Sequence, residues 1–175
     1  MDLRSLIRDV PDFPKPGIVF KDITTLTKNP DGFRQSVDDM AALYEGRGVD
    51  IVVGMESRGF IFGGAVAYLL NAGFVPARKP GKLPAGAISA EYELEYGTDK
   101  LEMHRDAIEK GQNVLIVDDL LATGGTAEAT VELVEKLGGN IVGIVFLIDL
   151  TFLKGREKLA DYEVSSLIEY GSEQG

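Results

Sequence analysis

The 175 residues include no cysteine and one histidine, and their formal net charge is -10. These features exclude disulfides, zinc–thiolate sites, a cysteine nucleophile and a multi-histidine metal centre. The acidic balance argues against a broad nucleic-acid surface, because phosphate backbones require clustered Lys and Arg. The length suits one compact domain. No run of about 18 apolar residues occurs, so we expect a cytoplasmic protein with no membrane partner.

The N-terminal part, about residues 1–30, is interrupted by proline. Residues 11–23 carry three prolines and a glycine before a short strand-like piece. Proline removes a helical hydrogen bond and clashes with the preceding turn, so this segment cannot form a long helix.

Buried strands and helices alternate through the rest of the chain. Short runs that are apolar on both faces are typical of strands in a parallel sheet, and they lie at residues 49–55, 114–117 and 141–148. Apolar residues at helical spacing predict helices at residues 33–44, 60–70 and 127–137. The second helix is apolar almost all round, so we expect it to be deeply buried. The alternation predicts an α/β fold whose central, mostly parallel sheet is flanked by helices.

Residues 79–98 do not fit this alternation. Glycine and proline punctuate the segment, and only residues 88–94 have partial strand character. Long irregular segments in compact domains are often active-site lids. We interpret the segment as an extended, mobile loop or ribbon over the site; a peripheral hairpin without a role is the alternative.

The motif with the clearest chemistry is VLIVDDLLATGGT at residues 114–126. It reads as a buried strand, two carboxylates, a short turn and a Gly-rich helix start. Main-chain N–H groups at such a helix start are unpaired, glycine lets an anion approach them, and the helix dipole favours negative charge. The motif therefore predicts a monophosphate site formed by Ala122, Thr123, Gly124, Gly125 and Thr126.

Asp118 and Asp119 stand directly before this phosphate site. Carboxylates accept hydrogen bonds from ribose hydroxyls, and they stabilise the positive charge that develops at an anomeric carbon during displacement. Phosphate donors beside paired carboxylates thus point to a ribose 5-phosphate. The G-x-x-x-x-G-K-[ST] and G-x-G-x-x-G patterns of other nucleotide sites are absent.

The stretch DDLLATGGT resembles the phosphoribosyl pyrophosphate motif of type I phosphoribosyltransferases. The similarity extends over nearly the whole chain and is strongest to members that act on adenine. Besides the central motif, it rests on the number and order of five matching segments, which lie at residues 11–24, 54–63, 78–84, 94–108 and 150–159. The resemblance implies a small N-terminal hood, a flexible lid, a homodimer and a role in purine salvage.

The resemblance also implies how the base is held. The main chain of Val19 and Lys21 would read the edge of adenine, and Phe20 and Leu150 would pack on its two faces. A flat base requires apolar faces and a few polar contacts at its edge. From the sequence alone, Phe20 and Leu150 would be interpreted as core residues.

Glu56, Ser57 and Arg58 resemble the pyrophosphate loop of the family, in which a cis peptide at Glu56–Ser57 is expected. Arg58 can bind phosphate oxygens with two hydrogen bonds. By the same resemblance, Lys79 and Lys82 would bind pyrophosphate, and Arg78 would reach it across a dimer interface; a surface ion pair or a solvated face is the alternative for these cations. Mg²⁺ would arrive with the substrate rather than on a protein motif.

Glu95 resembles the lid carboxylate that acts as acid and base at the purine, where the ring N–H must lose a proton as N9 attacks. Two alternatives remain open. The first is the same transfer to hypoxanthine, guanine, xanthine or orotate, although no side chain stands out as a donor to a 6-oxygen. The second is a non-catalytic nucleotide-sensing regulator, which the acidic charge disfavours.

Overall fold

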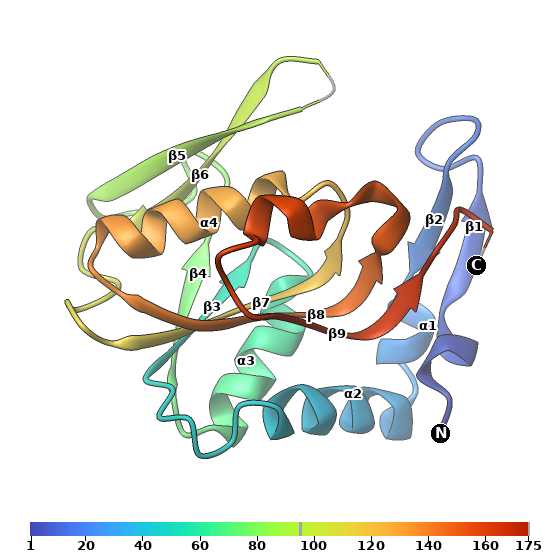
Figure 1. The fold of residues 1–175 in the computed structure, drawn as a ribbon, viewed down its shortest axis with the longest axis horizontal. Coiled ribbons are helices and arrows are strands. Elements are labelled where there is room, and N and C mark those ends of the chain that lie inside the picture. Colours follow the sequence, from blue (N-terminus) through green and yellow to red (C-terminus); the bar gives the residue numbers. More distant parts are fainter. Residues whose placement is uncertain (95, 175) are drawn as a thin grey trace.

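A five-stranded, wholly parallel sheet forms the centre of the molecule in the computed structural model, which describes residues 1–94 and 96–174 (Figure 1). In spatial order its strands are β4 (Gly73–Ala77), β3 (Ile51–Met55), β7 (Asn113–Leu121), β8 (Asn140–Leu150) and β9 (Val164–Tyr170). Because all five run in one direction, the segments that follow them meet at one edge of the sheet. Ligands bind at this edge in open α/β sheets.

Helices cover both faces of the sheet. Helices α2 (Pro30–Ala42) and α3 (Gly59–Leu69) lie on one face, and α4 (Gly125–Lys136) lies on the other (Figure 1). The start of α2 follows the usual rules: the Asn29 side chain accepts a hydrogen bond from the Gly32 N–H at 2.9 Å, and Pro30 takes the first helical position. In the described part of the chain, no helix combines the length and the apolar character needed to cross a membrane.

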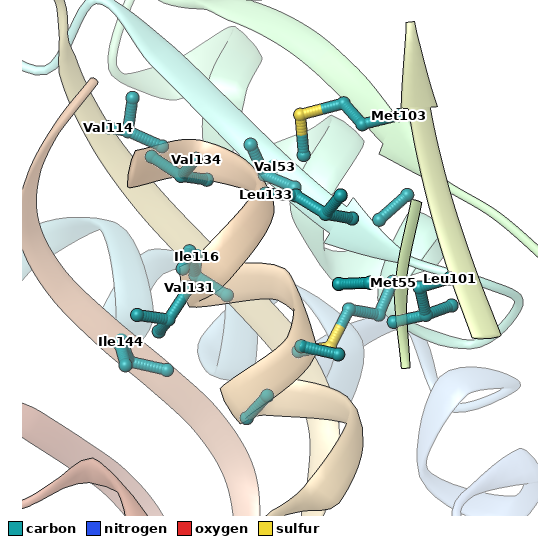
Figure 2. Close-up of a cluster of buried hydrophobic side chains, with 14 of the residues drawn as sticks. Val53, Met55, Leu101, Met103, Val114, Ile116, Val131, Leu133, Val134 and Ile144 are labelled. Carbon is teal, nitrogen blue, oxygen red and sulfur yellow. The ribbon is translucent and has the colours of Figure 1, made fainter. Parts of the chain in front are cut away.

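The core divides into two clusters, one on each face of the sheet. Figure 2 shows the cluster beneath α4, where side chains of that helix meet the sheet and the β5–β6 hairpin. The helix contributes Val131, Leu133 and Val134. Burial of this apolar stripe provides the main stabilisation of α4 on the sheet, since a helix of this length is marginal alone.

Two hairpins stand outside the central sheet. Strands β1 (Arg8–Pro11) and β2 (Val19–Asp22) form the first, and β5 (Ala87–Glu93) and β6 (Thr98–His104) form the second. The prediction that residues 11–23 form no long helix is confirmed. Short segments complete the chain: η1 (Leu3–Leu6), α1 (Thr24–Thr27), η2 (Thr151–Leu153) and η3 (Gly155–Leu159).

The segment expected to be a mobile loop or ribbon, residues 79–98, contains strand β5, which supports the ribbon; its mobility and its action as a lid stay predictions. Residues on β5 alternate between exposed and buried, and Ala90 and Tyr92 face the core beside Leu101 and Met103 of β6. The dense glycines and prolines belong to residues 80–86, ahead of the ribbon. The two-residue alternation expected at residues 88–94 follows them in β5.

Two further predictions need correction. Strand β7 continues through Leu121, so Asp118 and Asp119 lie within the strand instead of following it. Helix α3 is not buried all round: Tyr68 is 85% exposed, and Ile61 and Leu69 are also exposed. The sheet covers only one side of this helix, and uniform apolar composition cannot distinguish the covered side from the uncovered one.

Candidate active site

The predicted phosphate site is a loop of residues 122–126 that joins the carboxyl end of β7 to α4; we call it the phosphate loop. Gly124 has a φ of 91° and Gly125 begins the helix. Among the described residues, no side chain accepts a hydrogen bond from the start of α4. Its first N–H groups are therefore available to an anion, and the helix dipole adds to their attraction.

A second glycine, Gly155, packs against this loop. A Cβ at Gly124 would lie 2.7 Å from the Gly155 carbonyl oxygen, and a Cβ at Gly155 would lie 2.5 Å from the Ala122 carbonyl oxygen. Main chain thus packs directly against main chain at this point. Sequence reasoning missed Gly155, because the contact joins segments about thirty residues apart.

Replacing Gly124 by alanine tests this packing. A non-glycine residue at positive φ costs about 1–2 kcal/mol, and the new methyl group would also displace the Gly155 carbonyl. We expect a lower free energy of unfolding and at least about a tenfold higher KM for phosphoribosyl pyrophosphate. Denaturant titration and initial rates provide the readouts. Gly111→Ala is the matched control: its φ of 87° is also positive but its Cβ meets nothing within 4 Å, so it should lose stability without changing the KM.

A cavity of about 560 Å³ opens over the phosphate loop. Tyr92, Glu93 and Leu94 of the β5–β6 hairpin form one wall, and Lys158 of η3 contributes to another. The carboxyl end of β5 therefore borders the site, as expected for a lid. Lys158 was not predicted; its only signal is its place within residues 150–159, one of the segments that carry the family resemblance.

A neighbouring cavity of about 510 Å³ gathers the predicted pyrophosphate residues. It shares Leu120 and Thr126 with the first cavity, so the two meet at the phosphate loop. Its other lining residues are Glu56, Ser57, Arg58, Arg78, Lys79, Lys82, Asp118 and Asp119. The segments that bear them follow or end β3, β4 and β7, which explains how residues distant in sequence converge.

Carboxylates hold the cations of this cavity in place. Glu56 accepts hydrogen bonds from Arg78 Nε at 2.8 Å and from Lys82 Nζ at 2.7 Å. Burial alone would raise the pKa of Glu56, but these two cations outweigh it and lower that pKa. Arg58 donates to Asp119 at 2.5 Å, and Lys79 donates to Asp99 at 2.6 Å. A pyrophosphate would meet cations that are already positioned.

Asp118 is in a different electrostatic state from these paired carboxylates. Burial, and then the adjacent charge of Asp119, raise the pKa of Asp118 well above that of an ordinary aspartate. The folded protein therefore binds a proton at Asp118 more tightly than the unfolded chain does. The stability that this protonation contributes is present at low pH and is lost as pH rises from about 3.9 through the raised folded-state pKa.

Asp118→Asn should therefore stabilise the fold while it impairs the site. The amide does not titrate, so its advantage over the carboxylate should be small at pH 4.5 and grow to about 1 kcal/mol at pH 7.5. Urea titrations of both proteins at the two pH values measure this difference. If the difference in free energy of unfolding between the variant and the parent protein were the same at both pH values, the raised pKa would be contradicted.

Strand β2 carries the residues predicted to read the base. The Phe20 ring lies 5.5 Å from the Arg58 guanidinium carbon, which brings this hairpin next to the second cavity. The Lys21 side chain is buried and donates to Asp9 at 2.8 Å, so only its main chain is free for a ligand. Leu150 ends β8 and packs at the margin of the core cluster beneath α2 and α3. That Phe20 and Leu150 enclose a base stays a prediction.

Three other predictions have different outcomes. The cis peptide expected between Glu56 and Ser57 is present. Arg78 lines the cavity of its own chain, and its reach across a dimer stays a prediction. Glu95 lies outside the described residues, so its role as acid and base also stays a prediction. Within the described ranges, no cluster of three or more His, Cys, Asp or Glu side chains could hold a metal ion.

The structure thus brings together the Gly-rich loop at a helix start, the carboxylate pair and the cation-lined cavity that the sequence predicted for a phosphoribosyltransferase. The family model of the phosphoribosyl transferase domain matches residues 22–173, and the chain belongs to the phosphoribosyltransferase family. The prediction of this family and of its fold is confirmed.

Similar proteins include adenine phosphoribosyltransferases. The enzyme of Acaryochloris marina is 61% identical, over 97% of this chain and 100% of the relative. Among solved structures, adenine phosphoribosyltransferase from Thermoanaerobacter pseudethanolicus is 56% identical with a TM-score of 0.94, over 97% of this chain and 98% of that one. The Saccharomyces cerevisiae enzyme, complexed with an imino-altritol bisphosphate and adenine, is 44% identical with a TM-score of 0.89, over 93% and 94% of the two chains.

Proposed function

We propose that this chain transfers the 5-phosphoribosyl group of phosphoribosyl pyrophosphate to adenine, giving AMP and pyrophosphate, a purine salvage step. The observation that carries the proposal is the meeting of two cavities at the phosphate loop, one beside free helix N–H groups and one lined by cations and paired aspartates. Relatives about 60% identical over nearly the whole chain carry the same activity in their names.

The sugar phosphate would span the two cavities. Its 5-phosphate accepts hydrogen bonds from the main-chain N–H groups of Thr123 to Thr126, with the Thr hydroxyls as further donors. Its 2- and 3-hydroxyls donate to Asp118 and Asp119. The same carboxylates stabilise the positive charge that develops at the anomeric carbon as the bond between that carbon and the pyrophosphate oxygen lengthens.

Pyrophosphate would lie among the cations of the second cavity. Arg58, Arg78, Lys79 and Lys82 surround that space, and Ser57 adds a hydroxyl. Magnesium enters as part of the substrate, bound to the pyrophosphate oxygens, where it offsets their charge. The pyrophosphate would compete with Glu56, Asp99 and Asp119 for the hydrogen bonds of these cations.

The base would bind under the hood formed by residues 1–30, on the far side of the sugar from the pyrophosphate. Val19 and Lys21 would read its edge through the main chain, with Phe20 and Leu150 on its faces. N9 attacks the anomeric carbon, which inverts, and Glu95 takes the ring proton. The ribbon within residues 79–98 would close over the site and exclude water, which would otherwise hydrolyse the activated sugar.

We also propose that the protein works as a homodimer. The exposed side of α3 presents Ile61, Tyr68 and Leu69, and Phe74 of β4 is exposed as well. Contiguous apolar side chains of this size are usually covered by a partner. Analytical ultracentrifugation tests this: the proposal predicts twice the mass of one chain.

A panel of bases tests the function. The protein would be incubated with phosphoribosyl pyrophosphate, Mg²⁺ and, in separate reactions, adenine, hypoxanthine, guanine, xanthine or orotate. We expect nucleoside monophosphate and pyrophosphate from adenine, and little or none from the others. Product from a different base would move the assignment to that base. No product from any base would contradict an enzyme and favour a nucleotide sensor.

A further inference from the structure

A carboxylate from the C-terminal segment reaches the hood. The Val19 N–H donates to Oε2 of Glu173 at 3.2 Å, although the two residues are 154 positions apart. Figure 1 shows the C-terminus beside β1 and β2. No local pattern connects these two segments, and Glu173 takes part in no step of the proposed transfer.

The direction of the β2 main chain makes this contact informative. The Phe13 N–H donates to the Ile18 carbonyl, and the Ile18 N–H donates to the Lys15 carbonyl, so Ile18 faces the rest of its own hairpin. Main-chain groups of successive residues alternate across a strand. Val19 and Lys21 therefore direct their N–H and C=O groups to the opposite, free edge of β2. That edge is the one we propose reads the base, and Glu173 lies on it.

Buried residues hold the C-terminal segment in this position. Tyr170 ends β9, three residues before Glu173, and is only 4% exposed. The Lys21 ammonium lies 4.3 Å from the centre of the Tyr170 ring and donates to the Glu173 main-chain oxygen at 3.5 Å. Asp9 holds the same ammonium at 2.8 Å. Tyr170 and the Lys21 ammonium thus both hold the segment that brings Glu173 to Val19.

We infer that Glu173 determines which base this site accepts, an inference that rests on the proposed function. A strand edge presents donors and acceptors in alternation, so by itself it can pair with an amino or an oxo base. A carboxylate only accepts hydrogen bonds. Placed beside Val19, it would accept a hydrogen bond from the exocyclic amine of a 6-aminopurine. The same carboxylate repels the lone pairs of a 6-oxopurine and leaves that oxygen unpaired.

The test compares two substitutions of Glu173 with adenine and hypoxanthine as substrates, at saturating magnesium phosphoribosyl pyrophosphate. Glu173→Gln keeps the size of the side chain and adds an N–H donor. We expect its kcat/KM for adenine to fall by about tenfold or more, chiefly through the KM for adenine. Its ratio of hypoxanthine to adenine turnover should rise by at least about tenfold, because the amide can donate to the 6-oxygen.

Glu173→Ala distinguishes the effect of a new hydrogen-bond donor from the effect of a smaller side chain. It should lose adenine kcat/KM to a similar degree but gain less for hypoxanthine, since it offers no donor. The KM for phosphoribosyl pyrophosphate should stay unchanged in both variants, which a general disturbance of the fold would not allow. Gln174→Ala, at the neighbouring exposed position, is the control and should match the parent protein.

The possible outcomes distinguish a failure of this inference from a failure of the proposed function. An unchanged ratio in Glu173→Gln, or a rise in adenine kcat/KM in Glu173→Ala, would overturn the inference; the rise would mean that Glu173 competes with the base. Either result leaves the proposed function standing if the parent protein forms AMP. A parent protein that forms no AMP from adenine would overturn both.

Discussion

Replacing Asp118 and Asp119 together by alanine is expected to lower kcat/KM for phosphoribosyl pyrophosphate by roughly 10²–10⁴-fold. In the proposed complex each carboxylate would make a charge-assisted hydrogen bond of about 1.5–3 kcal/mol to a ribose hydroxyl, and every 1.4 kcal/mol is a factor of about ten. The fold should survive, because the partner that Asp119 leaves behind, Arg58, has a half-exposed side chain and can be hydrated.

The asparagine variants separate the two contributions of these carboxylates. Asparagine still accepts a hydrogen bond from a hydroxyl but carries no charge, so it should retain binding and lose stabilisation of the transition state. We expect kcat to fall more than KM rises in both single variants. The matched control replaces Asp106 and Glu109 by alanine: both are exposed and line neither cavity, and the net charge changes equally. Turnover of the double alanine variant within about threefold of the parent would contradict the proposed role of the pair.

Arg156→Ala is expected to cause the largest loss of stability. Asp149 is 1% exposed, and Arg156 Nε donates to its Oδ2 at 2.6 Å. Among the described residues, the other carboxylate oxygen of Asp149 has no hydrogen-bond partner. Removing Arg156 leaves a buried charge without compensation, which typically costs about 3–5 kcal/mol. The expected fall in Tm is roughly 10 °C or more for a chain of this size.

The same arginine positions the active site. It also donates to the Val164 carbonyl at 2.9 Å and to Ser166 at 3.0 Å, so it fastens the segment that carries Gly155 to β9. Loss of these bonds should loosen the packing of Gly155 on the phosphate loop and raise the KM for phosphoribosyl pyrophosphate. Differential scanning fluorimetry and initial rates measure the two effects.

Arg47→Ala provides the matched control for Arg156. Arg47 also pairs with a carboxylate, that of Glu163, and donates to a main-chain carbonyl, but Glu163 is half-exposed. Exposed pairs of this kind contribute about 0–1 kcal/mol. The double variant Asp149→Asn with Arg156→Met should recover much of the lost stability, because no buried charge then remains. Equal losses of Tm in the two arginine variants would argue against an unpaired buried charge as the cause.

The central sheet and the phosphate loop could be predicted because each depends on local sequence. Three short apolar runs, each typical of a buried strand, identified β3, β7 and β8. The Thr-Gly-Gly-Thr turn identified the start of α4. The order of those strands places the Glu56–Arg58 loop beside the phosphate loop. The pyrophosphate residues converge as expected, although their role stays a prediction.

The remaining features depend on contacts between distant segments, which local patterns do not encode. Gly155 packs on Gly124, and Glu173 reaches Val19, only because the chain returns to the site after β8 and β9. The exposed side of α3 could not be predicted from a helix that is apolar throughout. The strand within the lid segment is an exception, because its alternation at residues 88–94 is local, and β5 spans Ala87–Glu93.

A crystal structure with AMP bound would test the assignment of the phosphate loop. We expect the phosphate to lie within hydrogen-bond distance of the main-chain N–H groups of Thr123 to Thr126, and the ribose hydroxyls to contact Asp118 and Asp119. A phosphate bound among Arg58, Lys79 and Lys82, with the phosphate loop empty, would contradict it.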